Sequence, residues 1–401
     1  MTRWLTILGV GDDGVAGLVP AARELLDGAE IVVGSKRVID GTSFGSAEVH
    51  TWSEPITSKI DELKNWRGRK VAVLATGDPM HYGVGSLLVK RFGIDETTII
   101  PSPSAFSLAA ARLGWPLQDV ETISLHGRPV PLLQPLLQPN ARIIALTAGP
   151  ETLREVIDCL NRNGFPESRL TVLEHMGGVR ENQVSFVAST ASPPDIAQFC
   201  TLGIECVAAA DANWLPRVPG LPDEAYVHDG QLTKQEVRAA TLAALQPRPG
   251  ALLWDVGAGC GSVSVEWVRT SRGARAIAFE RDPERITMIK ENASALGAPG
   301  IEIVAGDVPG TLNGALQPDA IFLGGAVSDA GVFEACWQAL PEGGRMVCNS
   351  VTLEGEAAQI ARQDAHGGDL LRIDVSTITK VGRKHALRPR MSVLQWRATK
   401  G

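Results

Sequence analysis

Residues 252–262 read LLWDVGAGCGS, an apolar strand pattern that turns through three glycines into a helix. Glycine suits a backbone that turns sharply and lies against a ligand, because a Cβ atom would collide there. Dinucleotide-binding folds favour G-x-G-x-x-G, which seats a pyrophosphate on the helix amino terminus. The spacing here is G-x-G-x-G, and Asp255 stands two residues before the first glycine. We therefore expect a ligand that lacks a phosphate and carries a cation near Asp255, held by Gly257, Gly259 and Gly261.

Two more carboxylates follow at the ends of later strands. Glu280 ends the second strand of this half, where a carboxylate can bind both hydroxyls of a ribose. Asp307 ends the third strand, where it can meet the amine of an adenine. Taken singly, each carboxylate is more typical of a solvated loop, and a glycine turn that serves only packing is the alternative interpretation. Together with Asp255 they predict an adenosyl pocket.

These motifs resemble those of the class I methyltransferases, which bind S-adenosylmethionine. The resemblance rests on four places in the chain: residues 255–261, Glu280, residues 306–307 and the run DAIFLGG at residues 319–325. Residues 232–238, LTKQEVR, resemble the segment that opens the precorrin methyltransferases that act at carbon 15 and decarboxylate. That resemblance implies that Thr233 and Lys234 lie near the substrate mouth.

The first half of the chain has its own glycine turn. Residues 75–85 read ATGDPMHYGVG, which predicts a strand end, a tight turn and a helix start. Gly77 and the fixed backbone of Pro79 make a rigid surface of carbonyl and amide groups that is suited to gripping a zwitterion. A purely structural turn is the alternative. Two further strands end in PSPSA at residues 101–105 and ALTAG at residues 145–149.

This set of turns resembles the tetrapyrrole methylases, two-lobed enzymes that hold S-adenosylmethionine in the cleft between their lobes. The resemblance implies that the contacts to the cofactor come from Thr76, Gly77, Asp78, Ser104, Ala105 and Thr147. One loop departs from the family pattern, since Asp12-Asp13-Gly14 stands where a Gly-Asp step is usual. We therefore assign Asp12 and Asp13 no role.

Both halves alternate short β-branched runs with amphipathic helices, which is typical of parallel α/β layers. We expect a two-lobed, class III tetrapyrrole methylase fold in residues 1–212, with its last strand at residues 206–209. A doubly wound, Rossmann-like class I fold is expected in residues 230–401. Prolines and glycines mark residues 213–229 as a linker. Such a linker suggests a thin interface, so we expect the two halves to work separately.

Composition limits the class of protein. The chain has 401 residues, is 44% hydrophobic and carries a net charge of −7, so no overall positive field exists to hold nucleic acid. Its six cysteines show neither a C-x-x-C pair nor the spacing of a zinc site, and we expect no metal. The amino terminus lacks a signal-peptide pattern, and no apolar run is long enough for a membrane span. We expect a cytoplasmic homo-oligomer that binds neither nucleic acid nor membranes.

The two resemblances together imply the family of bifunctional precorrin methyltransferases of cobalamin biosynthesis, with two S-adenosylmethionine sites per chain. The implied substrate is a polycarboxylate tetrapyrrole, reduced precorrin-6 (precorrin-6B). The first half would methylate carbon 5. The second half would methylate carbon 15 and release carbon dioxide from the ring-C acetate at carbon 12, which gives precorrin-8.

Decarboxylation leaves an electron pair on the macrocycle, and a general acid near the ring helps to neutralise it. The candidates are Lys234, Arg238, Lys380 and His385. The last two belong to the basic segment at residues 380–390, which we expect to be a loop in a closing antiparallel hairpin. Its lysines and arginines suit a substrate rich in carboxylates, and a solvated turn is the alternative.

Two rival functions stay open. The first half could be a non-catalytic binding module, which would leave a single-activity methyltransferase. The glycines at residues 257–261 could instead serve a nicotinamide oxidoreductase.

Overall fold

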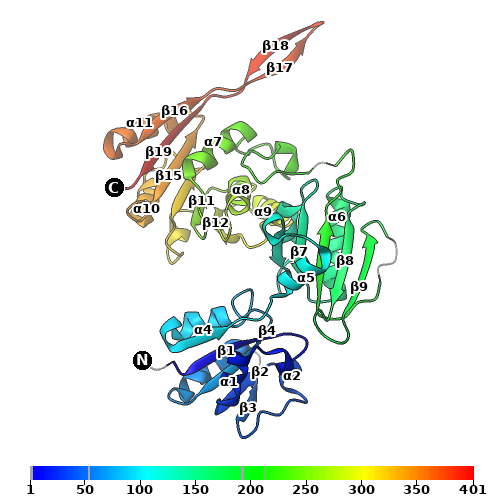
Figure 1. The fold of residues 1–401 in the computed structure, drawn as a ribbon. Coiled ribbons are helices and arrows are strands. Elements are labelled where there is room, and N and C mark those ends of the chain that lie inside the picture. The colour runs from blue at the N-terminus through cyan, green and yellow to red at the C-terminus, as the bar shows by residue number, and fades with distance from the viewer. Residues whose placement is uncertain (1–2, 53–54, 191–193, 213) are drawn as a thin grey trace. The chain divides into compact units, whose positions relative to one another are not determined.

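The computed structural model describes residues 3–52, 55–190, 194–212 and 214–401, and the chain divides into two compact units (Figure 1). Unit 1 comprises Met1–Val130 and Pro139–Asn213, and unit 2 comprises Pro131–Gln138 and Trp214–Gly401. A short piece from the middle of the first half therefore packs with the second half. Within the described ranges, no helix is both long and apolar enough to cross a membrane.

Unit 1 begins with a parallel five-stranded sheet in the order β3-β2-β4-β1-β5. Its strands are β1 (Leu5–Val10), β2 (Ile31–Gly34), β3 (Glu48–Thr51), β4 (Val71–Thr76) and β5 (Thr97–Ile100). The helices are α1 (Pro20–Asp27), α2 (Lys36–Ile39), α3 (Ile56–Glu62) and α4 (Gly85–Phe92), with short 3-10 turns η1 (Val15–Gly17), η2 (Leu63–Trp66) and η3 (Ile94–Glu96). Helices α3 and α4 cover one face of the sheet, and α1 covers the other. Alternate side chains along each strand therefore pack in two separate cores, one on each face.

The second lobe of unit 1 is a mixed sheet in the order β6-β7-β10-β8-β9. Its strands are β6 (Glu121–Ser124), β7 (Arg142–Leu146), β8 (Arg169–Glu174), β9 (Asn182–Val187) and β10 (Cys200–Glu205), accompanied by α5 (Ala105–Leu113), η4 (Leu117–Asp119) and α6 (Pro150–Arg162). Only β6 and β7 pair in parallel. The expectation of parallel layers is wrong for this lobe, since β8 and β9 are joined by a connection too short for a parallel crossover. The strand expected at residues 206–209 ends instead at Glu205.

Unit 2 is a seven-stranded sheet in the order β13-β12-β11-β14-β15-β19-β16. The five consecutive parallel strands are β11 (Leu252–Val256), β12 (Arg275–Glu280), β13 (Glu302–Ala305), β14 (Ala320–Leu323) and β15 (Arg345–Ser350). Strand β19 (Val393–Thr399) runs antiparallel to both of its neighbours, β15 and β16 (Asp369–Ile373). The helices are α7 (Gln235–Leu245), α8 (Ser262–Thr270), α9 (Pro283–Ala295), α10 (Ala330–Ala339) and α11 (Leu353–His366), with 3-10 turns η5 (Val130–Leu136), η6 (Asp223–Ala225) and η7 (Gly310–Leu312). Helices cover both faces of the sheet, so the doubly wound fold expected for this half is confirmed (Figure 1).

The basic segment near the carboxyl terminus is not a loop. It forms a two-stranded ribbon of β17 (Ser376–Val381) and β18 (Lys384–Pro389), which extends beyond β16 and β19 (Figure 1). The expectation of a loop at residues 380–390 is therefore wrong. A two-residue turn begins with Gly382 at a φ of 62°, and such a turn joins adjacent antiparallel strands even where nearly every side chain is exposed.

The proline-rich segment that the sequence marks as a linker packs onto unit 2. Leu215, Leu221 and Tyr226 are buried in the same apolar core as α7 and α8. Prolines and glycines exclude regular secondary structure here, but they do not exclude burial of the apolar side chains between them. A fragment that began at Gly220 would therefore lack part of the core of unit 2.

Candidate functional site

The glycine loop of unit 2 follows β11 at the carboxyl ends of the parallel strands, where open α/β sheets bind ligands. Gly257, Gly259 and Gly261 have φ values of 72°, 59° and 79°, which side chains rarely adopt. A Cβ atom on Gly257 would lie 2.9 Å from the backbone of Gly325, which follows β14. The loop therefore needs glycine both for its conformation and for its close approach to the neighbouring turn.

Asp255 is the buried acid of this loop. Its Oδ2 atom accepts hydrogen bonds from the Ser264 amide at 3.0 Å and the Ser264 hydroxyl at 2.7 Å. Its Oδ1 atom is buried and has no partner among the described residues. Burial raises the pKa of Asp255 to about 6, the Ser264 hydrogen bonds oppose that rise, and the negative charge of Glu280 adds to it. A buried carboxylate oxygen without a partner fits a ligand that brings a cation.

The other two acids lie on the strands next along the sheet. Glu280 is buried at the end of β12, where its carboxylate accepts hydrogen bonds from the amides of Gly259 at 2.8 Å, Arg281 at 2.9 Å and Asp282 at 3.0 Å. Asp307 follows β13, is largely exposed, and lies 3.3 Å from Arg281. The structure thus brings Asp255, Glu280 and the glycines together, and it places Asp307 at the rim.

These residues fit S-adenosylmethionine, because the free oxygen of Asp255 suits its ammonium and the glycines leave room for its backbone-like chain. Glu280 already anchors the glycine loop through Gly259 and retains acceptor capacity for hydroxyl groups.

In unit 1 three turns meet at the carboxyl ends of β1, β4 and β5. A Cβ atom on Gly9 would lie 2.3 Å from both the Gly77 carbonyl oxygen and the Ser102 amide nitrogen. Gly77 has a φ of 64° and donates its amide to the Val10 carbonyl at 2.8 Å. Gly9 and Ser102 thus join the residues predicted at this site, and the Gly9-Val10-Gly11 spacing and the run at residues 101–105 are their signals in the sequence.

The predicted contacts of unit 1 fall into two groups. Thr76 ends β4, and Asp78 in the following turn accepts a hydrogen bond from the Met80 amide at 2.8 Å. Ser104 caps α5 by accepting from the Ser107 amide at 3.1 Å, and Ala105 is the first residue of that helix. These residues lie around the turn of Gly77, where an added Cβ atom would be 3.8 Å from the Ser104 Cα.

Thr147 is different, because it belongs to the second lobe. It follows β7, is buried, and its hydroxyl donates to the Cys200 carbonyl oxygen at 3.0 Å. Its amide donates to the same carbonyl oxygen at 3.2 Å, so both the side chain and the amide are used within the lobe.

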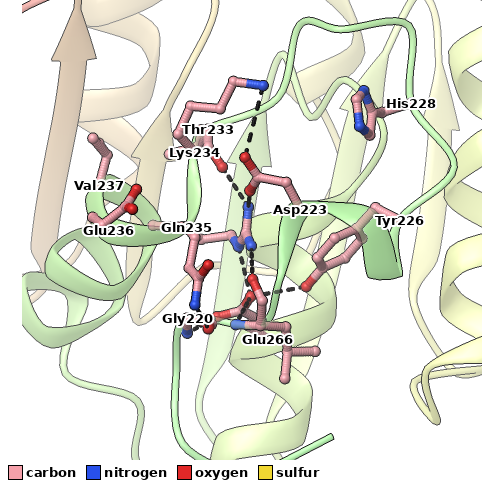
Figure 2. A network of polar contacts seen from close by, with 12 residues as sticks. Gly220, Asp223, Tyr226, His228, Thr233, Lys234, Gln235, Glu236, Val237 and Glu266 are labelled. Carbon is pink, nitrogen blue, oxygen red and sulfur yellow. Dashed lines mark hydrogen bonds and ion pairs between the residues drawn. The ribbon is translucent and has the colours of Figure 1, made fainter. Parts of the chain in front are cut away.

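The four candidates for the general acid lie in two places in unit 2. Arg238 on α7 is fully buried, and its guanidinium donates to Glu266, Asp223 and the Thr233 carbonyl oxygen, three residues that Figure 2 labels. Burial works to lower the pKa of Arg238, but its contacts with Tyr226, Glu266 and Asp223 outweigh burial and raise it. A buried guanidinium of raised pKa is a poor proton donor, so the structure argues against Arg238 as the acid.

The other three candidates are accessible. Lys234 precedes α7, its side chain is 39% exposed, and its ammonium lies 3.7 Å from Asp223. Lys380 and His385 face each other across β17 and β18 and are exposed. Just beyond β18, Arg390 pairs with Glu236 of α7 at 3.0 Å, which brings the base of the ribbon to the helix that Lys234 precedes.

Glu266 is a residue that sequence analysis missed. It lies on α8 in the run SVSVEWVRT, where the apolar residues Val263, Val265 and Trp267 are buried around it. A lone acid on a buried helix face was the available signal, but the sequence does not reveal which cation it meets.

Comparisons with known proteins match both halves of the chain. A family model described as tetrapyrrole (corrin/porphyrin) methylases matches residues 5–191, and one described as a precorrin methyltransferase domain matches residues 224–400. A precorrin-6Y C(5,15)-methyltransferase (decarboxylating) from Sinorhizobium sp. is 43% identical over 402 residues, which cover 100% of this chain and 97% of the relative. A protein of the same name from Mycobacterium tuberculosis (strain H37Rv) is 38% identical over 404 residues, 99% of this chain and 100% of the relative.

Among solved structures, the C-terminal domain of precorrin-6Y C5,15-methyltransferase from Rhodobacter capsulatus covers 46% of this chain and 100% of its own, at 43% identity and a TM-score of 0.44. The full-length relatives and the two family models carry the assignment. The chain belongs to the family of decarboxylating precorrin-6Y C(5,15)-methyltransferases.

Proposed function

We propose that this chain methylates precorrin-6B at carbons 5 and 15 and removes carbon dioxide from the acetate at carbon 12, which yields precorrin-8. The observation that carries the proposal is the presence of two glycine-lined turns in one chain, one after β4 and one after β11, each at the carboxyl ends of a parallel sheet. Unit 1 methylates carbon 5, and unit 2 methylates carbon 15 and decarboxylates.

Each unit holds one S-adenosylmethionine, which supplies an activated methyl group on its sulfonium. In unit 2, Asp255 binds the ammonium, Glu280 takes the ribose hydroxyls, and Asp307 contacts the adenine at the rim. Gly257, Gly259 and Gly261 line the pocket. In unit 1 the contacts are Thr76, Gly77, Asp78, Ser104, Ala105 and Thr147.

Methyl transfer depends mainly on the alignment of the two reactants. A meso carbon of the reduced macrocycle is enamine-like and already nucleophilic, so the protein chiefly aligns it with the methyl group. Neither unit needs a nucleophilic side chain of its own.

Decarboxylation needs a proton donor and cationic side chains that bind the carboxylates of the substrate. Lys234 is the donor that lies closest to the glycine loop along the chain, and Lys380 and His385 on the ribbon are the alternatives. The basic side chains of the ribbon bind the peripheral carboxylates of the substrate, since lysine and arginine form charge-assisted hydrogen bonds with them. The active form is a homo-oligomer, which sedimentation of the full chain tests.

The deciding experiment is the mass of the product formed from precorrin-6B and methyl-labelled S-adenosylmethionine. Two labelled methyl groups together with the loss of one carbon dioxide are expected. A single methyl group would favour the reading in which unit 1 is a non-catalytic binding module. Calorimetry with S-adenosylhomocysteine should find two sites per chain, and NADH fluorescence should not change on mixing.

A further inference from the structure

Two opposite charges lie buried between α7 and α8. Arg238 is 0% exposed and Glu266 is 1% exposed, and the Arg238 Nε donates to the Glu266 Oε1 at 2.6 Å. Removing two charges from water is costly, and an apolar pair packs two helices at least as well. The packing of α7 on α8 therefore gives no reason for this pair, and its other contacts must be considered.

Both charges hold the segment Gly220–Lys234, which crosses unit 2 just before α7 (Figure 2). The Glu266 carboxylate accepts from the Gly220 amide at 2.6 Å, the Leu221 amide at 3.0 Å and the Tyr226 hydroxyl at 2.9 Å. Arg238 donates to the carbonyl oxygens at both ends of the segment, those of Leu221 and Thr233. The pair thus fixes where the segment begins and where it ends.

The middle of the segment lies against the glycine loop. The Gln231 carbonyl oxygen is 3.6 Å from the position that a Cβ atom on Gly259 would take. Asn292, which is buried on α9, joins the two: it accepts from the Val227 amide at 2.8 Å and donates to the carbonyl oxygens of Val227 and Cys260, each at 2.9 Å. The segment therefore lies against the glycine loop, and hydrogen bonds hold it there.

Asp223 connects the buried pair to an accessible cation. One of its oxygens is 3.3 Å from Arg238 Nη1, and the other is 3.7 Å from the Lys234 ammonium (Figure 2). The side chain of Asp223 is 16% exposed and that of Lys234 is 39% exposed. Arg238 thus sets the position of Asp223, and Asp223 sets the position of a lysine that a substrate can reach.

We propose that Arg238, Glu266 and Asp223 are positioning residues of the carbon-15 site. They hold the segment Gly220–Lys234 against the glycine loop, and they orient the Lys234 ammonium toward a carboxylate of the tetrapyrrole. The proposal rests on the proposed function of unit 2. According to the proposal, Arg238 is not a proton donor, and the carboxylates of Asp223 and Glu266 belong to the site as positioning groups.

The test uses the full chain and the Asp223→Asn variant, which keeps the shape of the side chain and removes its charge. Initial rates are followed by NMR with carbon-13-methyl S-adenosylmethionine, because the two methyl positions give separate signals. For carbon 15 we expect the KM of the tetrapyrrole to rise and kcat/KM to fall on the order of tenfold to a hundredfold. The carbon 5 rate on the same chain and the affinity for S-adenosylhomocysteine should stay unchanged.

Arg248→Gln is the matched control. Arg248 forms a 2.7 Å ion pair with Asp319 at the opposite, amino ends of the strands of unit 2, so its loss should alter neither rate. Lys234→Arg, which keeps the cation, should retain more carbon 15 activity than Lys234→Ala.

Glu266→Gln is the second variant, and its thermal unfolding is measured beside its rates. Loss of carbon 15 turnover and of one S-adenosylhomocysteine site, beyond any loss of folded protein, supports the proposal. Wild-type rates in Asp223→Asn, or a fall in carbon 15 turnover that merely follows the unfolded fraction in both variants, would overturn it. Failure of the unaltered chain to methylate carbon 15 would instead remove the proposed function itself.

Discussion

The protonation state of the Asp255 side chain depends on whether the pocket in unit 2 is empty or holds a ligand. Burial raises its pKa to about 6, well above the ordinary aspartate value. Its proton is therefore favoured by the folded state, and its ionisation lowers stability as pH rises from the unfolded pKa near 3.8 to the folded pKa near 6. Above that window the cost is constant, at about 3 kcal/mol.

A cationic ligand should reverse this cost. Because the ammonium of the ligand favours ionised Asp255, affinity of unit 2 for S-adenosylhomocysteine should weaken as pH falls through about 6. Calorimetry between pH 5 and pH 8, in buffers of different ionisation enthalpy, measures both the affinity and the protons released. The Asp255→Asn variant should bind more weakly at pH 8 and lose the pH dependence. An unchanged pH profile in that variant would exclude Asp255 as the ammonium partner.

Gly259 allows a second test at one residue. Its φ is 59°, and among the described residues the only atom within 4 Å of a Cβ there is the Gln231 carbonyl oxygen at 3.6 Å. Gly259→Leu should therefore fold with about 1–2 kcal/mol of backbone strain while its side chain fills the ligand space. Carbon 15 methylation should be abolished and carbon 5 methylation retained.

Gly343 provides the matched control, with a φ of 75° and no atom of the part of the chain that the structure describes within 4 Å of a Cβ position. Gly343→Leu carries the same strain in the turn before β15, so it should lower the unfolding temperature by a similar amount and leave both methylations intact. Equal loss of activity in the two variants would mean that strain alone disables the enzyme.

Among the secondary-structure elements, the ribbon of β17 and β18 is the one least tied to the fold. Its side chains are nearly all exposed, and an isolated two-stranded ribbon is only marginally stable in water. Replacing Arg383, Lys384 and Arg388 by glutamine should therefore leave the thermal unfolding of unit 2 almost unchanged.

The same triple variant should raise the KM for the tetrapyrrole about tenfold at low salt, since charge-assisted contacts to several carboxylates are lost. The difference from the unaltered chain should shrink as salt screens exposed charges. Binding of S-adenosylhomocysteine is the control and should not change. A KM equal to that of the unaltered chain at every salt concentration would exclude the ribbon from substrate binding.

The two units of the chain are not two consecutive halves of its sequence. Residues Pro131–Gln138 pack within unit 2, where Arg269 donates to Gln134 and to the carbonyl oxygens of Leu296 and Pro216. Burial lowers the pKa of Arg269 to about 10. The chain therefore enters unit 2 twice, and the first entry is hydrogen-bonded to the proline-rich segment, since Gln138 donates to the Leu215 carbonyl oxygen at 2.9 Å and Arg217 donates to that of Pro135 at 3.1 Å.

We expect a chain cut in its native state, at a protease site introduced around residue 213, to stay in one complex. The piece that contains residues 131–138 remains held by Arg269, so both pieces should co-elute in gel filtration. Arg269→Leu leaves several buried carbonyl oxygens without a donor, at about 1–3 kcal/mol each, and the cut variant should separate. Separation of the cut unaltered chain would contradict this prediction. The expected independence of the halves would then stand.

Much of the fold could be predicted from the local pattern of the sequence. The apolar runs that end in glycine turns predicted β4 and β11, and the apolar run that ends at Glu280 predicted β12, because strand period and turn chemistry depend on residues next to each other in the chain. Asp255 and Glu280 were placed correctly at neighbouring strand ends for the same reason, since parallel strands bring their carboxyl ends to one edge. The two-residue turn at Gly382 was overlooked because basic residues obscured the strand pattern around it.

What the sequence alone established was the pair of folds and the turns that each presents to a ligand, all properties of short stretches with a regular period. Only the tertiary structure decided that Arg238 meets Glu266, that Gly220, Leu221 and Val227 are hydrogen-bonded to α8 and α9, and that residues 131–138 pack within unit 2. The partner of a buried charge is chosen by packing between distant stretches. Proline and glycine content reveals where regular structure stops, but not what the chain then lies against.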